Sequence, residues 1–159
     1  MDVKFLNPFT EAAQKVLEAE CSLAVQRGPL TVQKSSMTAE EVTVLINIVG
    51  QVEGTVLYGM NMQTALNLVS RVMGKEFPEF DDLARSGVAE LGNVITGQAT
   101  IKLSQAGYES KISPPTMIEG KDVEISILDF QRIVVPMATE AGDIIVHLGI
   151  RESRPTVTV

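Results

Sequence analysis

The sequence predicts a single domain of the α/β class (α+β type), with long helices packed on a mainly antiparallel β-sheet. Two observations lead to this prediction. Three segments place apolar residues at helical spacing, and several others alternate apolar with polar residues and are rich in β-branched side chains. A helix followed by three or more strands occurs twice along the chain, which is consistent with a duplicated helix–three-strand unit.

The first helix is predicted over residues 7–20, with the sequence NPFTEAAQKVLEAE. Asn7 is a favourable N-cap, and Pro8 fits the first helical position. Apolar residues recur at the spacing that predicts one buried stripe, formed by Phe9, Ala12, Ala13, Val16 and Leu17.

Strands are expected next. The segment 21–33 is typical of a strand that is broken or bent near Gly28 and Pro29. Residues 41–60 alternate and are rich in β-branched side chains, which predicts an antiparallel hairpin with its turn between Gly50 and Gly54.

The second helix is predicted over residues 61–74, because Asn61 can cap its start and Gly74 can end it. Its stripe is expected to contain Met62, Ala65, Leu66, Val69, Val72 and Met73. A third helix is expected to begin at Asp81 or Asp82 and to run to about Ala106, with Gly107 as its stop, over a length of roughly 40 Å.

The C-terminal part returns to strands, predicted over 108–113, 122–128, 131–139 and 143–150. Residues 114–121 are expected to form a loop, and 140–143 a tight turn. The segment TVLYGM at 55–60 is similar in pattern to IVHLGI at 145–150, which again fits a duplication. We assign residues 1–151 to one domain and residues 152–159 to a tail or an edge-strand extension.

Composition and charge exclude several function classes. Apolar residues make up 45% of the chain, enough to fill a core, and the net charge of −7 disfavours binding to nucleic acid. No apolar run reaches the roughly 18 residues of a membrane span, and the N-terminus lacks a secretory pattern. We therefore expect a cytoplasmic protein with no membrane partner, in which Cys21 is a small core residue.

The third helix carries the candidate site. At about 100° per residue, Ser86, Glu90, Asn93 and Gly97 fall within roughly 60° of one another, and Ala89 lies beside them. The apolar residues of the opposite face are expected to be buried: Ala84, Val88, Leu91, Ile95 and Ala99. An exposed Glu and an exposed Asn are common on helices, so this spacing alone leaves an ordinary solvated face as an alternative.

Three glycines distinguish this helix from an ordinary one, because each costs roughly 1 kcal/mol relative to alanine in a helix interior. Gly87 and Gly92 flank the core stripe, where they would permit close packing. Gly97 lies on the face of Asn93, where it would keep the surface low for an approaching protein.

In these residues the sequence resembles the CheX family of chemotaxis phosphatases, relatives of CheC and FliY. The family motif is a Ser or Asp, a Glu four residues later and an Asn three residues after that, matched here by Ser86, Glu90 and Asn93. The resemblance extends over most of residues 5–150 and includes the segments NPFTEAAQKVL, GTVLYGMNMQTALNLVSRVMGKEF and LSQAGYESKISPPTMIEG.

The resemblance implies a CheC/CheX-like fold and a homodimer that pairs through its sheets. CheC-type relatives carry a second Glu and Asn on the first helix. The matching positions here are Glu11 and Gln14, and because Gln14 replaces Asn we predict that this helix is not a second catalytic site.

The resemblance also implies the substrate, a CheY-like response regulator phosphorylated on Asp. Hydrolysis of an acyl phosphate depends mainly on positioning water. Asn93 suits this task, because an amide can orient water and adds no negative charge. Glu90 would accept a bond from the regulator's active-site lysine, as the resemblance implies. Ser86 would hydrogen-bond Glu90, contact the partner, or simply keep the surface low.

No cofactor is expected on this chain. The sequence offers no cluster of metal ligands, no glycine-rich phosphate loop and no Ser-His-Asp set, and His147 is interpreted as a structural residue in a strand. The Mg²⁺ that the reaction needs is expected in the response regulator. The alternatives to a phosphatase are a non-catalytic docking module that binds a signalling or flagellar partner through the same face, and an oligomer without this activity.

Overall fold

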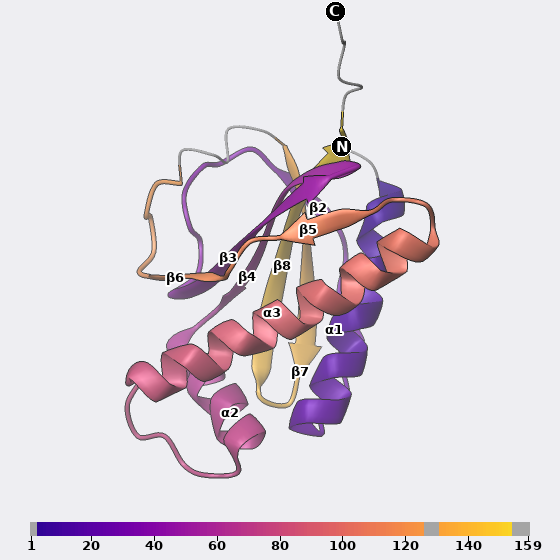
Figure 1. The fold of residues 1–159 in the computed structure, drawn as a ribbon. Coiled ribbons are helices and arrows are strands. Elements are labelled where there is room, and N and C mark those ends of the chain that lie inside the picture. Colours follow the sequence, from indigo (N-terminus) through magenta and orange to yellow (C-terminus); the bar gives the residue numbers. More distant parts are fainter. Residues whose placement is uncertain (1–2, 126–130, 154–159) are drawn as a thin grey trace, which may run out of the picture.

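The computed structural model describes residues 3–125 and 131–153, and it contains one antiparallel sheet with its helices on one side (Figure 1). A short 3-10 turn, η1 (Val3–Phe5), leads into the first helix. The helices are α1 (Leu6–Cys21), α2 (Met62–Met73) and α3 (Asp82–Gln105). The strands are β1 (Gln26–Arg27), β2 (Thr31–Gln33), β3 (Val42–Gly50), β4 (Val52–Met60), β5 (Ser110–Ile112), β6 (Thr116–Glu119), β7 (Arg132–Thr139) and β8 (Gly142–Glu152).

The sheet is built from two long hairpins, β3–β4 and β7–β8, that meet along β4 and β8. In that ladder Leu57 lies opposite His147, Thr55 opposite Gly149, and Gly59 opposite Ile145. The third residues of TVLYGM and IVHLGI pair with each other, and the first residue of each segment pairs with the fifth residue of the other. The two segments are therefore related by a local two-fold axis. The two similar segments are therefore the paired centre of the sheet.

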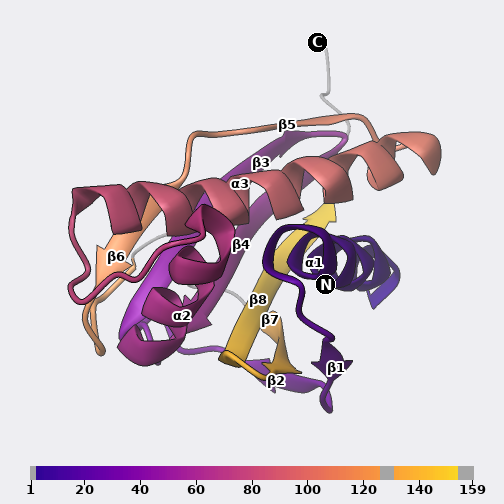
Figure 2. The same cartoon turned by 90° about the horizontal axis from the view of Figure 1, so that it is seen from below.

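The short strands complete the duplicated arrangement. β1 and β2 pair with β7, whereas β5 and β6 pair with β3. Each unit has two short strands and a two-stranded hairpin, so it holds four strands rather than the three of the predicted unit, and it adds its short strands to the hairpin of the other unit. This confirms the predicted α+β fold with a duplicated unit. The helices of both units lie on the same side of the shared sheet (Figure 2), and their buried residues form one core.

The predicted caps of α2 and α3 are confirmed, but the predicted cap of α1 is wrong. Asn61 accepts a hydrogen bond from the Thr64 N–H, and Gly74 ends α2 with a positive φ of 65°. By contrast, α1 begins at Leu6 after η1, with Phe5 at the cap position and no side-chain cap bond. The side chain of Asn7 instead accepts a bond from Arg27, because the first turn of the helix is joined directly to η1.

Three predictions in the β regions need correction. Residues 21–33 do not begin as a strand, because α1 continues to Cys21; the break near Gly28 does separate β1 from β2. The expected loop 114–121 contains β6, which supplies a partner for the backbone of β3. In the segment 122–128, residues 122–125 form only an isolated bridge, Met37 to Glu124, and the remainder lies outside the described residues.

At the C-terminal end, β8 extends through Glu152 and pairs with Val52, so the strand runs one residue past the expected domain boundary at 151. Ser153, the next residue of the expected tail, follows the strand, and residues 154–159 lie outside the described residues.

The core lies between the helices and the sheet, and the stripes predicted for α1 and α3 are both buried. The stripe predicted for α2 is only partly right, because Met73 is 36% exposed whereas Leu68, which the prediction left out, is buried. Alanines at Ala12, Ala13, Ala84 and Ala99 are fully buried, and such small side chains allow close packing of helices. Cys21 is buried as well, and its burial raises the pKa of the thiol to about 11. The thiol therefore acts as the expected small core residue.

The opposite side of the sheet holds His147 in a buried polar network. Arg132 Nε donates to His147 Nδ1 at 3.2 Å, so His147 Nε2 carries the proton and donates to Glu40 at 2.6 Å. Burial lowers the pKa of Arg132. Because every member of this network has a partner, the structural interpretation of His147 is supported.

Candidate active site on helix α3

Helix α3 presents the candidate site, and its start is fixed by local chemistry. Asp81 lies at the N-cap, and its carboxylate accepts a hydrogen bond from the Ala84 N–H at 2.9 Å. The helix has 24 residues, which gives a length of about 36 Å. It crosses the helix side of the molecule, with α1 and α2 as neighbours (Figures 1 and 2).

The predicted site residues occur together on the outer face of α3. Ser86 and Glu90 are exposed, whereas Asn93, Ala89 and Gly97 are half-buried. Their helical positions place them opposite the buried stripe, as predicted. The polar pair therefore points away from the core.

The polar side chains of this face are unpartnered in the described part of the chain. The side chains of Ser86, Glu90 and Asn93 make no hydrogen bond and no ion pair with any other described side chain or backbone group. Of the three roles expected for Ser86, the hydrogen bond to Glu90 is therefore not formed. The other two roles, contact with a partner and a small side chain that keeps the surface low, stay predictions.

The two basic side chains of α3, Arg85 and Lys102, each pair with other carboxylates, and neither is a counter-ion of Glu90. Arg85 pairs with Glu119 at 2.8 Å and with Asp82 at 3.0 Å. Lys102, on the side of α3 next to α1, pairs with Glu11 at 3.0 Å. A cation that meets Glu90 must therefore come from outside this group of side chains.

The three glycines have the two roles that the sequence predicted. A Cβ at Gly87 would lie 2.6 Å from Val69 on α2, and one at Gly92 would lie 3.0 Å from Val44 on β3. The lack of a side chain at these two glycines therefore lets α3 pack closely against α2 and the sheet. A Cβ at Gly97 would meet nothing within 4 Å, so this glycine lies on an open surface.

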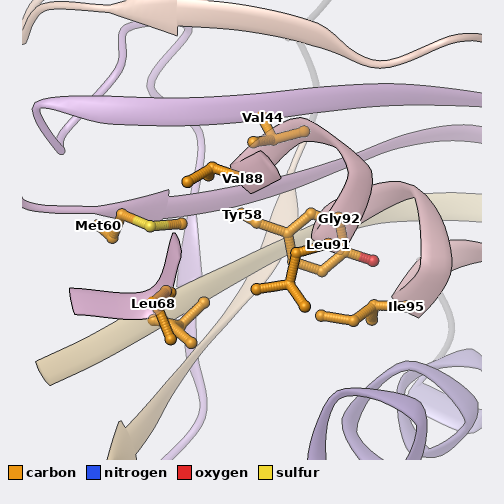
Figure 3. A pocket seen from close by; sticks show the side chains of 9 residues that line it. Val44, Tyr58, Met60, Leu68, Val88, Leu91, Gly92 and Ile95 are labelled. Carbon is orange, nitrogen blue, oxygen red and sulfur yellow. The ribbon is translucent and has the colours of Figure 1, made fainter. Parts of the chain in front are cut away.

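The inner side of α3 is anchored to the sheet next to the site. Thr96 donates to the Gly92 carbonyl at 2.7 Å, so its hydroxyl oxygen accepts from Tyr58 at 2.8 Å. Tyr58 is fully buried, and burial raises the pKa of its phenol. Figure 3 shows Tyr58 beneath Gly92, where nine residues line an apolar cavity of only about 10 Å³. This packing holds the backbone next to Asn93 in one place.

The described residues contain no group of three or more His, Cys, Asp or Glu side chains placed to hold a metal ion. Within the same ranges, no helix combines the length and the apolar composition needed to cross a membrane.

The outer face of α3 offers one carboxylate acceptor and one amide on a low, rigid surface. Chemically, it can accept a bond from a cation and orient a water molecule.

Sequence reasoning missed two residues on this face. Leu83 is 47% exposed and Ile101 is 54% exposed, although both are large and apolar. The helical spacing of the sequence could have identified both residues. Leu83 and Ile101 are 18 residues apart, which equals five full helical turns, so both lie on the side of α3 that carries Glu90.

The fold and this face define a protein of the CheC and CheX group. The structure is similar to a CheC-like superfamily protein from Shewanella sp. PV-4, with a TM-score of 0.84 and 27% identity over 95% of this chain and 99% of that one. It is also similar to CheX in the CheX–CheY–BeF3–Mg²⁺ complex from Borrelia burgdorferi, with a TM-score of 0.78 and 30% identity over 95% and 100% of the two chains.

Sequence comparison gives the same family. The family model described as chemotaxis phosphatase CheX matches residues 42–138. A Thermotoga maritima protein named CheY-P phosphatase CheX is 34% identical over 127 residues, which covers 79% of this chain and 81% of that protein. The chain therefore belongs to the CheX family.

Proposed function

We propose that this chain is a phosphatase that accelerates hydrolysis of the aspartyl phosphate on a CheY-like response regulator. The observation that carries the proposal is the unpartnered pair Glu90 and Asn93 on the low outer face of a firmly anchored helix. Two relatives support it: one is named a CheY-P phosphatase, and the other is present in a complex with CheY, BeF3 and Mg²⁺.

Asn93 orients the attacking water in this mechanism. Water attacks phosphorus as the bond to the aspartyl oxygen breaks, which releases inorganic phosphate and restores the carboxylate. An amide can donate to and accept from one water molecule without repelling the phosphoryl oxygens. Because the Asn93 side chain makes no competing internal bond in the described chain, it is available for this role.

Glu90 docks the partner. Its carboxylate would be repelled by a phosphoryl group, so we assign it to a lysine of the response regulator, with which it forms a charge-assisted hydrogen bond. That bond places Asn93, less than one turn further along α3, beside the phosphate. Ser86, Ala89 and Gly97 complete the contact surface.

The metal ion that the reaction needs is expected in the partner, and the proposal also covers the location and the oligomeric state of this chain. The response regulator would hold the Mg²⁺, which would supply charge neutralisation at the phosphoryl oxygens. We propose that the chain acts in the cytoplasm, where its phosphorylated partner is located, and that it forms a homodimer with one site per chain.

The decisive experiment measures phosphate release from a panel of response regulators, each phosphorylated in advance, with and without this chain. Catalysis predicts faster phosphate loss from at least one regulator at substoichiometric concentrations of the chain. A stable complex without faster phosphate loss would instead indicate the non-catalytic docking module. Absence of both binding and acceleration across the panel would exclude the CheY-like substrate.

A further inference from the structure

Three exposed apolar side chains lie around the Glu90–Asn93 pair. Leu83 and Ile101 are on α3, with 47% and 54% of their surface exposed, and Met73 is at the end of α2, with 36% exposed. Exposed positions of a helix are usually occupied by Lys, Glu or Gln, so these side chains leave apolar area in water that a partner can cover.

The two residues on α3 bracket the polar pair. Leu83 precedes Glu90 by seven residues, or about two turns, and Ile101 follows Asn93 by eight. Leu83 and Ile101 have the same angular position and are separated by about 27 Å along the helix axis. A protein that contacts both of them must pass over Glu90 and Asn93.

Met73 of α2 adds apolar surface next to Leu83, on the same side of the polar pair. A Cβ at Gly87 would lie 2.8 Å from the Met73 methyl group, so the absence of that Cβ gives Met73 its place against α3. Gly87 lies four residues after Leu83 and three before Glu90, and thus between them on the helix. Methionine is flexible and polarizable, which suits a surface that must adapt to a partner.

We propose that Leu83 with Met73, on one side of the polar pair, and Ile101, on the other, are apolar contacts that dock the response regulator. This inference rests on the proposed function, because the same partner must bring its phosphate to Asn93. The partner therefore carries apolar side chains on both sides of its phosphorylated Asp and a lysine between them. Apolar contacts around a central charged pair exclude water from it and so strengthen it.

The test uses the CheY-type receiver domain whose phosphate loss the wild-type chain accelerates most. Steady-state kinetics are measured for Leu83→Gln, Ile101→Gln, Met73→Gln and the double variant of the two α3 residues. Glutamine keeps a high helix propensity. The matched control is Val49→Thr, because Val49 is 60% exposed but lies on β3, away from this face. Thermal unfolding verifies that each variant is folded.

Each α3 substitution is expected to raise KM about fivefold, as for burial of roughly half of a large aliphatic side chain, with kcat within about twofold of wild type. The double variant should multiply the two effects, because the sites are far apart. Unchanged KM in both α3 variants, or an equal rise in the Val49 control, would overturn the inference. If the wild-type chain accelerates no regulator, the proposed function fails first, and this inference fails with it.

Discussion

Helices α1 and α3 carry the same spacing of polar residues, but only on α3 are all three side chains without a partner among the described residues. On α1 the positions that match Ser86, Glu90 and Asn93 are Asn7, Glu11 and Gln14. Glu11 pairs with Lys102 at 3.0 Å, and Asn7 accepts a bond from Arg27 at 3.2 Å. The carboxylate on α3 is therefore unpaired, as the proposed docking requires, whereas the carboxylate on α1 already has a partner.

The two helices also differ in the height of their surfaces. Four residues after Asn93, α3 has Gly97, which faces open space. Four residues after Gln14, α1 has Glu18, an exposed and charged side chain. A phosphorylated partner would meet a bulky anion on α1 and a bare backbone on α3. The comparison therefore predicts one site per chain, and the following substitutions test it in order of expected effect.

Replacement of Asn93 by Ala is expected to have the largest effect. Loss of the water-orienting amide should lower kcat about 100-fold, the size expected when a reacting group is misplaced, with binding of the regulator largely unchanged. Single-turnover phosphate release measures this directly. Gln98→Ala is the matched control, since Gln98 is an exposed amide on the same helix. Equal turnover by Asn93→Ala and wild type would show that Asn93 does not act in hydrolysis.

Replacement of Glu90 by Gln should act on docking. The variant keeps the shape of the side chain but removes the charge, so KM should rise roughly tenfold while kcat changes little. The difference from wild type should shrink as salt is raised, because screening weakens an exposed charge pair. A KM that equals the wild-type value at low salt would refute the pairing with a partner lysine.

Substitutions at Gly97 should separate stability from docking. Gly97→Ala fits without contact and should raise the free energy of unfolding by about 1 kcal/mol, or the Tm by roughly 2–4 °C. Gly97→Glu, which copies Glu18 of α1, should raise KM several-fold despite adequate stability. A Tm below that of wild type for Gly97→Ala would contradict the open surface at this position.

The smallest effects are expected on α1. Glu11→Ala and Gln14→Ala should each leave kcat and KM within about twofold of wild type, and loss of the exposed Glu11–Lys102 pair should cost at most about 1 kcal/mol of stability. Kinetics and thermal unfolding measure both. A tenfold loss of turnover in either variant would show that α1 contributes a second site.

The sequence by itself determined the features that depend on neighbouring residues. Helical periodicity placed Glu90 and Asn93 on one face and predicted the buried stripes of α1 and α3. The caps at Asn61 and Asp81 were also predictable, because the bond joins a side chain to a backbone group three residues away.

Only the tertiary structure decided the features that join distant segments. β6 forms because β3 provides a partner, and Asn7 fails as a cap because η1 leads directly into α1. The pairing of Glu11 with Lys102 requires α1 and α3 to lie side by side, and Met73 of α2 packs against Gly87 of α3. The sequence places a side chain on a face, whereas long-range packing decides which neighbours that side chain meets and whether it stays available for a partner.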